Sequence, residues 1–240
     1  MYFKIGNEYD KKSDYNKALE YYEKSYEIRK KVYADNPNHP DIATSLNNIG
    51  LANKNKGDLN KALEYYEKSY EIYKKIYADN PNHPNIATSL ANIATIYYEK
   101  ADYNKALEYH EKSNKIFKKV YADDSNHPEI ATSLYNIGLV YNFKNEYDKA
   151  LEYCEKSYEI LKNVYADNPN HPFIATSLNN IGLVISNKGD YNKALEYFEK
   201  SYEIRKKVYA DNPNHTSIAN SMNNIGLVYD KKGDCYKALE

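Results

Sequence analysis

The sequence has no tryptophan and only two cysteines among its 240 residues. Cys154 and Cys235 lie far apart and hold different places in the pattern of the chain, so they form neither a disulfide framework nor a metal-binding motif. Sparse cysteine of this kind is typical of a reducing compartment. The cysteine content therefore favours an intracellular protein without a bound metal.

An excess of charge is lacking too, because 33 basic and 34 acidic residues leave a net charge of −1. Binding to nucleic acid requires a strongly basic face, which this balance does not offer. No segment approaches the ~18 apolar residues of a membrane span, and the first residues carry no apolar run of signal-peptide length. We therefore expect no nucleic acid and no membrane among the partners, and a cytoplasmic location.

Motifs of catalysis are missing as well. The sequence contains no glycine-rich phosphate loop and no nucleophile with a matched base. The adjacent acids Asp123 and Asp124 stand in an expected loop, where no pocket is implied. We therefore expect a protein that is not an enzyme and that needs no cofactor.

What the sequence does have is an internal repeat of 44 residues. The string KALE recurs from Lys17 to Lys61 and onward at multiples of this step, and NHP recurs from Asn38 to Asn82 in the same way. Such repeats indicate a stack of identical helical or strand units. The repeat predicts one domain over residues 1–240, divided into a partial repeat 1–39, full repeats 40–83, 84–127, 128–171 and 172–215, and a partial repeat 216–240.

Each repeat reads as two helices joined by a tight turn. In residues 40–84, Pro40 suits the first turn of a helix, with Asn38 or His39 as its cap, and Ile42 starts an apolar stripe at helical spacing. A second apolar stripe over residues 59–77 predicts the second helix, with Asp58 at its start. We therefore expect an all-α, right-handed superhelical solenoid of antiparallel helix pairs.

The turn between the two helices needs a residue with positive φ, which glycine adopts freely. Gly57 supplies it in the second repeat. The equivalent residues are Ser13, Ala101, Asn145, Gly189 and Gly233. Asparagine tolerates this conformation, so strain is expected only at Ser13 and Ala101.

The residues that recur along the two helices of each repeat resemble the tetratricopeptide signature of a bulky residue, a small residue, an aromatic and further small residues. In the second repeat they are Leu46, Ile49, Gly50, Asn53, Ala62, Tyr66 and Ser69, and copies follow along the chain. Lys74 replaces the closing proline of the family, which lengthens the second helix. The long repeat and the segment HPDIATSLNNIG resemble kinesin light chains and their relatives, although the coiled coil of those proteins is absent. The resemblance implies a protein-interaction fold.

In each expected first helix from residue 40 onward, one asparagine directly precedes an Ile-Gly or Ile-Ala pair. This asparagine ladder consists of Asn48, Asn92, Asn136, Asn180 and Asn224. The resemblance places it in the concave groove of the solenoid, where related proteins hold a peptide backbone with asparagine. An amide can answer both the N–H and the C=O of a peptide. The alternative is that each asparagine bonds to a neighbouring repeat and fixes the stacking.

Other residues of the expected groove differ between repeats. Tyr98, Tyr135 and Phe143 fall close together in this pattern and are candidates for an aromatic peptide-binding pocket, since interfaces favour aromatic anchors. The alternative is ordinary variation on a solvated face. The groove carries charges of both signs, so it predicts no preference for a charged ligand.

The repeated histidines also admit two interpretations. His39, His83, His127, His171 and His215 stand one per loop. Zinc needs several nitrogens about 2.1 Å from one centre, and loops of stacked repeats are too far apart for that, so we expect helix caps. His110 and Cys154 replace Tyr66 in their repeats, and we expect a packed, hydrogen-bonded imidazole and a small buried hydrophobe.

The sequence thus predicts a scaffold that binds an extended peptide or a helix of a partner protein in its groove. Two alternatives remain open. The chain is a structural solenoid whose uncapped ends associate end to end, or it is the regulatory repeat module of a larger protein.

Overall fold

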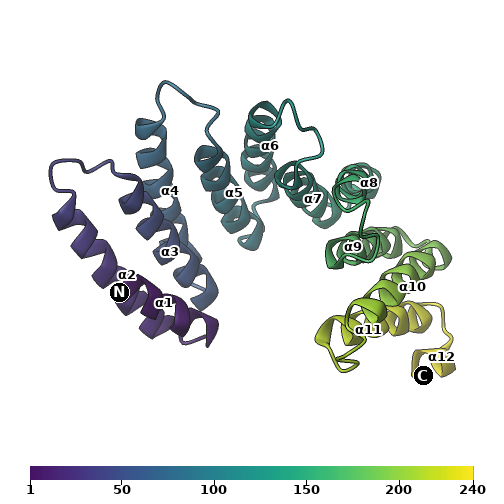
Figure 1. Cartoon of the computed structure of the whole chain (residues 1–240). Helices are drawn as coiled ribbons and strands as arrows, with labels where there is room; N and C mark the ends of the chain where they lie inside the picture. The colour runs from purple at the N-terminus through teal and green to yellow at the C-terminus, as the bar shows by residue number, and fades with distance from the viewer. Residues whose placement is uncertain (240) are drawn as a thin grey trace. The chain divides into compact units, whose positions relative to one another are not determined.

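The computed structural model describes residues 1–239, and within them every regular element is an α-helix (Figure 1). The helices are α1 (Tyr2–Lys11), α2 (Tyr15–Val32), α3 (Pro40–Lys56), α4 (Leu59–Ile76), α5 (Pro84–Glu99), α6 (Tyr103–Val120), α7 (Pro128–Phe143), α8 (Tyr147–Val164), α9 (Pro172–Lys188), α10 (Tyr191–Val208), α11 (Thr216–Lys231) and α12 (Cys235–Leu239). None of the described helices is long and apolar enough to cross a membrane.

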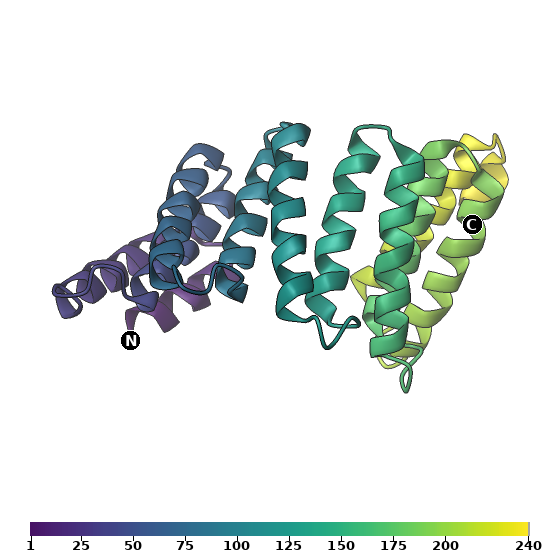
Figure 2. The ribbon, with the colours of Figure 1, turned by 90° about the horizontal axis from the view of Figure 1, so that it is seen from above.

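The helices form consecutive antiparallel pairs, which confirms the predicted all-α, paired-helix architecture (Figure 2). The chain divides into two compact units, Met1–Val120 and the part from Tyr121 onward. In each unit the helices of a pair pack against each other, and the second helix of one pair packs against the first helix of the next. The assignment of residues 1–240 to a single domain stays a prediction.

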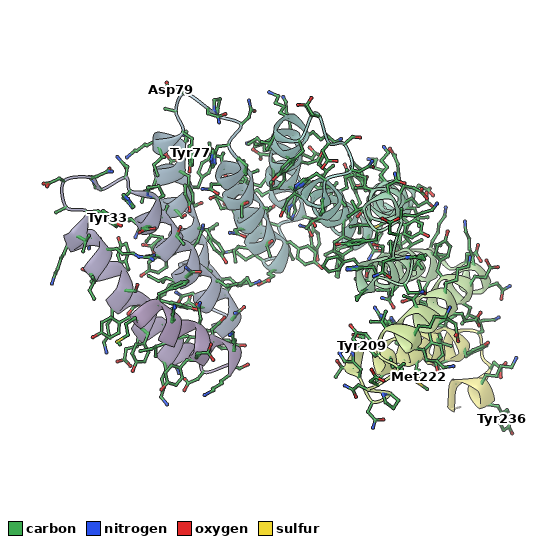
Figure 3. The ribbon with its side chains drawn as sticks, in the orientation of Figure 1. Tyr33, Tyr77, Asp79, Tyr209, Met222 and Tyr236 are labelled. Carbon is green, nitrogen blue, oxygen red and sulfur yellow. The ribbon has the colours of Figure 1, made fainter. Side chains whose placement is uncertain are left out.

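Each inter-repeat loop ends in a histidine that caps the next first helix. Nδ1 of His171 accepts a hydrogen bond from the backbone N–H of Phe173 at 3.2 Å, and its ring stacks on Tyr165 with centroids 3.6 Å apart. The other four loops repeat this arrangement, with stacking partners Tyr33, Tyr77, Tyr121 and Tyr209. Tyr33, Tyr77 and Tyr209 are labelled in Figure 3. The histidine, and not the preceding asparagine, is therefore the cap.

Backbone conformation at the tight turns follows the prediction. Gly57 has φ 89°, and Ser13, Ala101 and Asn145 each have φ 59°, in the left-handed region. Asp58 then accepts a hydrogen bond from the backbone N–H of Lys61 at 3.2 Å and caps the second helix. Asn145 accepts a bond from the Tyr147 hydroxyl at 2.7 Å, which leaves Ser13 and Ala101 as the less suited residues.

The two helices of a pair approach closely at small residues. A Cβ added to Gly50 would lie 2.8 Å from the ring of Tyr66, and the buried Ser69 donates to the carbonyl of Ala43 at 2.8 Å. Equivalent serine bonds of 2.7 to 2.8 Å recur in the next three pairs, from Ser113, Ser157 and Ser201. Small residues at these places therefore set the distance between the helices.

The pair of α5 and α6 departs from this arrangement. In the repeat 84–127 the glycine is replaced by Ala94 and the facing aromatic residue by His110. His110 is 3% exposed, and Nδ1 has no hydrogen-bond partner among the described residues. The prediction of a hydrogen-bonded imidazole is therefore wrong for this nitrogen, because no polar group of the described residues lies within hydrogen-bond reach of it. Burial lowers the pKa of His110 to about 4.

We expect the Ala101→Gly variant to raise the free energy of unfolding by about 0.5–1 kcal/mol, because glycine adopts positive φ without strain. Gly57→Ala is the matched control and should lower it by a similar amount, since a Cβ at Gly57 meets nothing within 4 Å and only the backbone conformation is changed. Urea unfolding measures both. Equal midpoints for Ala101→Gly and the parent would contradict the strain.

We expect His83→Ala to destabilise the fold by about 1 kcal/mol through the lost cap, and His83→Asn to restore most of it. Nδ1 of His83 accepts the bond from the backbone N–H of Asn85, so only the neutral ring can cap, and burial lowers the pKa of His83. The stability that neutral His83 contributes is present above about pH 6.5 and is lost as pH falls. Urea unfolding at pH 8 and pH 5 measures it, and a cap contribution that is equal at both pH values would contradict this role.

His110 makes a separate contribution to acid sensitivity. Its native pKa of about 4 lies below the ordinary value of 6.5, so stability of about 3 kcal/mol is lost as pH falls across this interval. The double variant Ala94→Gly/His110→Tyr recreates the pair found at Gly50 and Tyr66 and should remove this part of the pH dependence. Ala94→Gly alone is the control. If the free energy of unfolding falls equally steeply from pH 6.5 to pH 4 in the double variant and in the control, the contribution of His110 is contradicted.

Candidate functional site

The five residues of the asparagine ladder lie on α3, α5, α7, α9 and α11, and all are half-buried. On α3, Ile49 is fully buried in a cluster with Ala18 and Tyr22 of α2, and Asn48 is the residue before it on the same helix. The same order recurs in each first helix because the sequence repeats. We call the side of these helices that carries the ladder the first-helix face.

The ladder asparagines differ in their hydrogen bonds. Nδ2 of Asn48 donates to the carbonyl oxygen of Thr44 in its own helix at 2.9 Å. Nδ2 of Asn224 donates to Oδ1 of Asn179 in the preceding first helix at 2.8 Å. Only the bond of Asn224 matches the alternative in which the ladder fixes the stacking of repeats.

The remaining three ladder residues have side-chain amides without hydrogen bonds to the part of the chain that the structure describes. They are Asn92, Asn136 and Asn180. Asn47, which stands before Asn92 as Asn179 stands before Asn224, keeps a buried Oδ1 without a partner in residues 1–239. Amide donors and acceptors are therefore available on this face.

Polar pairs also link successive first helices at a spacing of one repeat plus one residue. Asn55 donates to Asp10 at 3.3 Å, and Asn187 donates to Asn142 at 3.1 Å. Lys54 and Glu99 form an ion pair at 3.8 Å in the same register. The sequence-based predictions did not include this pairing, because its register arises from the stacking of successive repeats and is not contained in any single repeat.

The three predicted aromatic anchors have different surroundings. Phe143 is 50% exposed, whereas Tyr135 is half-buried and packs against the cluster that contains Cys154 and Ile181. The ring of Tyr98 lies 6.1 Å from that of Tyr103. Tyr98 belongs to the first unit and the other two to the second, so a pocket formed by all three stays a prediction.

Burial keeps the phenol of Tyr135 and the thiol of Cys154 neutral. Burial, with a smaller effect of Cys154, raises the pKa of Tyr135, so its hydroxyl stays protonated. Burial also raises the pKa of the Cys154 thiol to about 12. Because thiolate and not thiol is the nucleophile and the metal ligand, Cys154 behaves as a small apolar residue, as expected.

No three His, Cys, Asp or Glu side chains converge on a possible metal position within the described residues. The loop histidines use Nδ1 for capping and their ring faces for stacking on tyrosine. Their chemistry is thus accounted for by the fold.

Hollows of different size lie in the second unit. A pocket of about 40 Å³ opens between α7 and α9 and is lined by Tyr135, Leu139, Asn142, Cys154, Asn180, Leu183 and Val184. An open groove of about 1030 Å³ lies between α8 and α10 over the buried Ile174 and Leu178. Lysines and glutamates alternate on the rim of the groove, so it favours no charge in a ligand. The small pocket lies beside a ladder residue.

Comparison with known families gives one consistent result. A tetratricopeptide repeat model matches residues 1–75, 129–207 and 173–240, and a second tetratricopeptide repeat model matches residues 86–129. No curated protein matches the sequence.

Solved structures show the same fold at low identity. BtubC (BKLC) from P. vanneervenii is 19% identical with a TM-score of 0.74, over 92% of this chain and 85% of that one. A Podosopora anserina protein with nearly identical TPR-like repeats, assigned as a kinesin light chain, is 21% identical with a TM-score of 0.72, over 87% and 95%. Apo RapI is 18% identical with a TM-score of 0.70, over 99% and 92%.

Proposed function

The chain belongs to the tetratricopeptide repeat family, and we propose that it is a non-enzymatic scaffold that binds an extended peptide or a helix of a partner protein along its first-helix face. Helical repeat folds of this type are typical of protein-interaction scaffolds. A cytoplasmic location, consistent with the sparse cysteine, is part of the same proposal.

The observation that carries this proposal is the set of unpaired amides on the first-helix face, above all Asn136 and Asn180 in the second unit. A half-buried amide without a protein partner relies on water, and a peptide backbone can replace that water with one donor and one acceptor per residue. Asn136 and Asn180 thus offer the same kind of bond in two successive repeats without demanding a particular ligand sequence.

The spacing of the ladder suits an extended ligand. Neighbouring packed helices lie roughly 10 Å apart, and the bond from Asn187 to Asn142 supports α7 and α9 as such neighbours. An extended chain advances about 3.3 Å per residue, so about three residues of ligand separate one ladder contact from the next. Side chains between these contacts are then free to reach the residues that differ between repeats.

We expect the double variant Asn136→Ala/Asn180→Ala to lose peptide affinity about tenfold or more, since each lost amide bond contributes about 1 kcal/mol. Its stability should stay at or above that of the parent, because neither amide bonds to the protein and alanine favours helices. The measurement is selection of peptides from a random display library on the parent, followed by titration of the enriched peptides with both proteins.

The matched control is Asn48→Ala/Asn224→Ala, which removes two amides that already bond to the protein. This control should lose stability and keep most of its peptide affinity. Enriched peptides that bind the Asn136→Ala/Asn180→Ala variant as well as the parent would contradict the proposed role of the ladder. A folded parent that enriches no peptide would exclude peptide binding, and concentration-dependent mass would then favour the self-associating solenoid.

A further inference from the structure

The repeat 128–171 differs from its neighbours at two places that face each other. Cys154 stands where the other repeats have Tyr22, Tyr66, His110 and Phe198. Tyr135 stands where the other first helices have Asn47, Ala91, Asn179 and Asn223. In this repeat the second helix therefore lacks the ring at the position of Cys154, and the first helix carries an additional ring at Tyr135.

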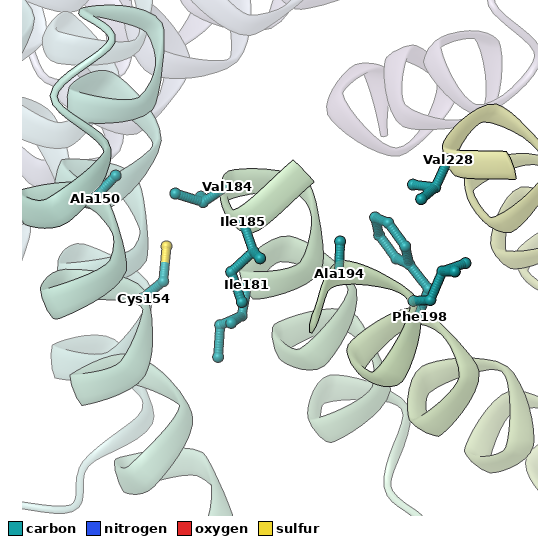
Figure 4. Close-up of a cluster of buried hydrophobic side chains, with 9 residues drawn as sticks. Ala150, Cys154, Ile181, Val184, Ile185, Ala194, Phe198 and Val228 are labelled. Carbon is teal, nitrogen blue, oxygen red and sulfur yellow. The ribbon is translucent and has the colours of Figure 1, made fainter. Parts of the chain in front are cut away.

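The exchange changes how the space beside the helix pair is filled. A Cβ added to Gly182 would lie 2.9 Å from the ring of Phe198, whereas a Cβ added to Gly138 would lie 2.8 Å from the Cys154 sulfur and otherwise near backbone atoms of α8. Figure 4 shows Cys154 and Phe198 in the same cluster of buried side chains. Tyr135 packs against the cluster that contains Cys154 and occupies part of the remaining space. The part left over is the pocket of about 40 Å³ between α7 and α9.

The pocket has an apolar floor and a polar border. Cys154 and Val184 are 3% exposed and lie at its inner side, and Leu183 is 38% exposed toward solvent. Asn142 and Asn180 also line it, and none of its lining residues carries a formal charge with the thiol and phenol protonated. Oδ1 of Asn142 already accepts a hydrogen bond from Asn187, whereas both the donor and the acceptor of the Asn180 amide are available to a ligand.

We propose that this pocket determines the specificity of the peptide site, by taking a small aliphatic side chain of alanine to valine size while Asn180 bonds to the adjacent peptide backbone. The inference rests on the proposed function. The neutral lining disfavours charged side chains, since a buried charge needs a partner. The volume disfavours rings, because a cavity of about 150 Å³ is the size that binds benzene.

Two substitutions at Cys154 change the pocket and leave Tyr135 and Asn180 in place. Cys154→Met should fill the space, because methionine adapts to irregular gaps. Cys154→Ala should enlarge it. Far-ultraviolet circular dichroism and urea unfolding establish that both variants are folded.

The first measurement tests the pocket without a peptide. Xenon binds apolar cavities, so it should shift the methyl resonances of Leu139, Leu183 and Val184 in the parent, shift them more in Cys154→Ala, and leave them unchanged in Cys154→Met. If xenon causes no shift of these methyl resonances, or equal shifts in all three proteins, the pocket is not present and the inference is wrong. Should Cys154→Met fail to fold, Val184→Ile is the alternative filling variant.

The second measurement tests the occupant with the peptides enriched from a random display library on the parent. These should share one position restricted to alanine or valine, and each methyl removed there should weaken binding about fourfold. Cys154→Met should show no such dependence, and selection on Cys154→Ala should enrich leucine or isoleucine instead.

The outcomes separate this inference from the function on which it rests. Peptides that need Asn136 and Asn180 but show no restricted small position would overturn the inference and leave the scaffold function intact. A folded parent that enriches no peptide would overturn both. Enriched peptides whose aliphatic preference is equal in the parent and in both Cys154 variants would place the specificity elsewhere and overturn the inference.

Discussion

The close approach of the two helices within each pair is the constraint on which the rest of the structure depends. A Cβ added at Gly6, Gly50, Gly138 or Gly182 would lie 2.7 to 2.9 Å from the residue that faces it. The buried serines bond across the same contact to the backbone of the partner helix. Since neither side can move, a larger residue at one place requires a smaller or different residue at the other. This contact recurs along the chain at multiples of 44 residues.

That constraint explains why the two irregular pairs change at two places each. Ala94 accompanies His110, and Tyr135 accompanies Cys154, whereas Gly50 and Gly182 accompany full aromatic rings. Neither exchange restores the lost arrangement completely. His110 retains a nitrogen without a described partner, and Cys154 leaves a pocket. Differences between repeats therefore leave an unpaired polar atom or a small hollow beside the helices, while the helices stay paired.

Local rules made the fold predictable from the sequence. Proline, histidine and glycine at fixed places give the helix starts and turns, and the structure agrees to within a residue or two. Contacts between first helices were not predictable in this way, because the register of one repeat plus one residue arises from stacking and is not contained in any single repeat. For that reason the sequence could not say that Asn224 is bonded and Asn180 is not, or that Tyr135 packs beside Cys154.

The spacing of one repeat plus one residue also relates Tyr135 to the available amide of Asn180. The bond from Asn224 to Asn179 joins asparagines one repeat and one residue apart, and Asn92 and Asn47 stand in the same register without such a bond. For Asn180 the residue in that register is Tyr135, whose side chain packs toward Cys154 and leaves the amide of Asn180 without a bond to the described residues. The tyrosine that partly fills the space beside Cys154 therefore also leaves a ladder amide available at the edge of the remaining pocket. Specificity on a repeated scaffold has to come from places where repeats differ, and here one difference supplies both a hollow and an available amide.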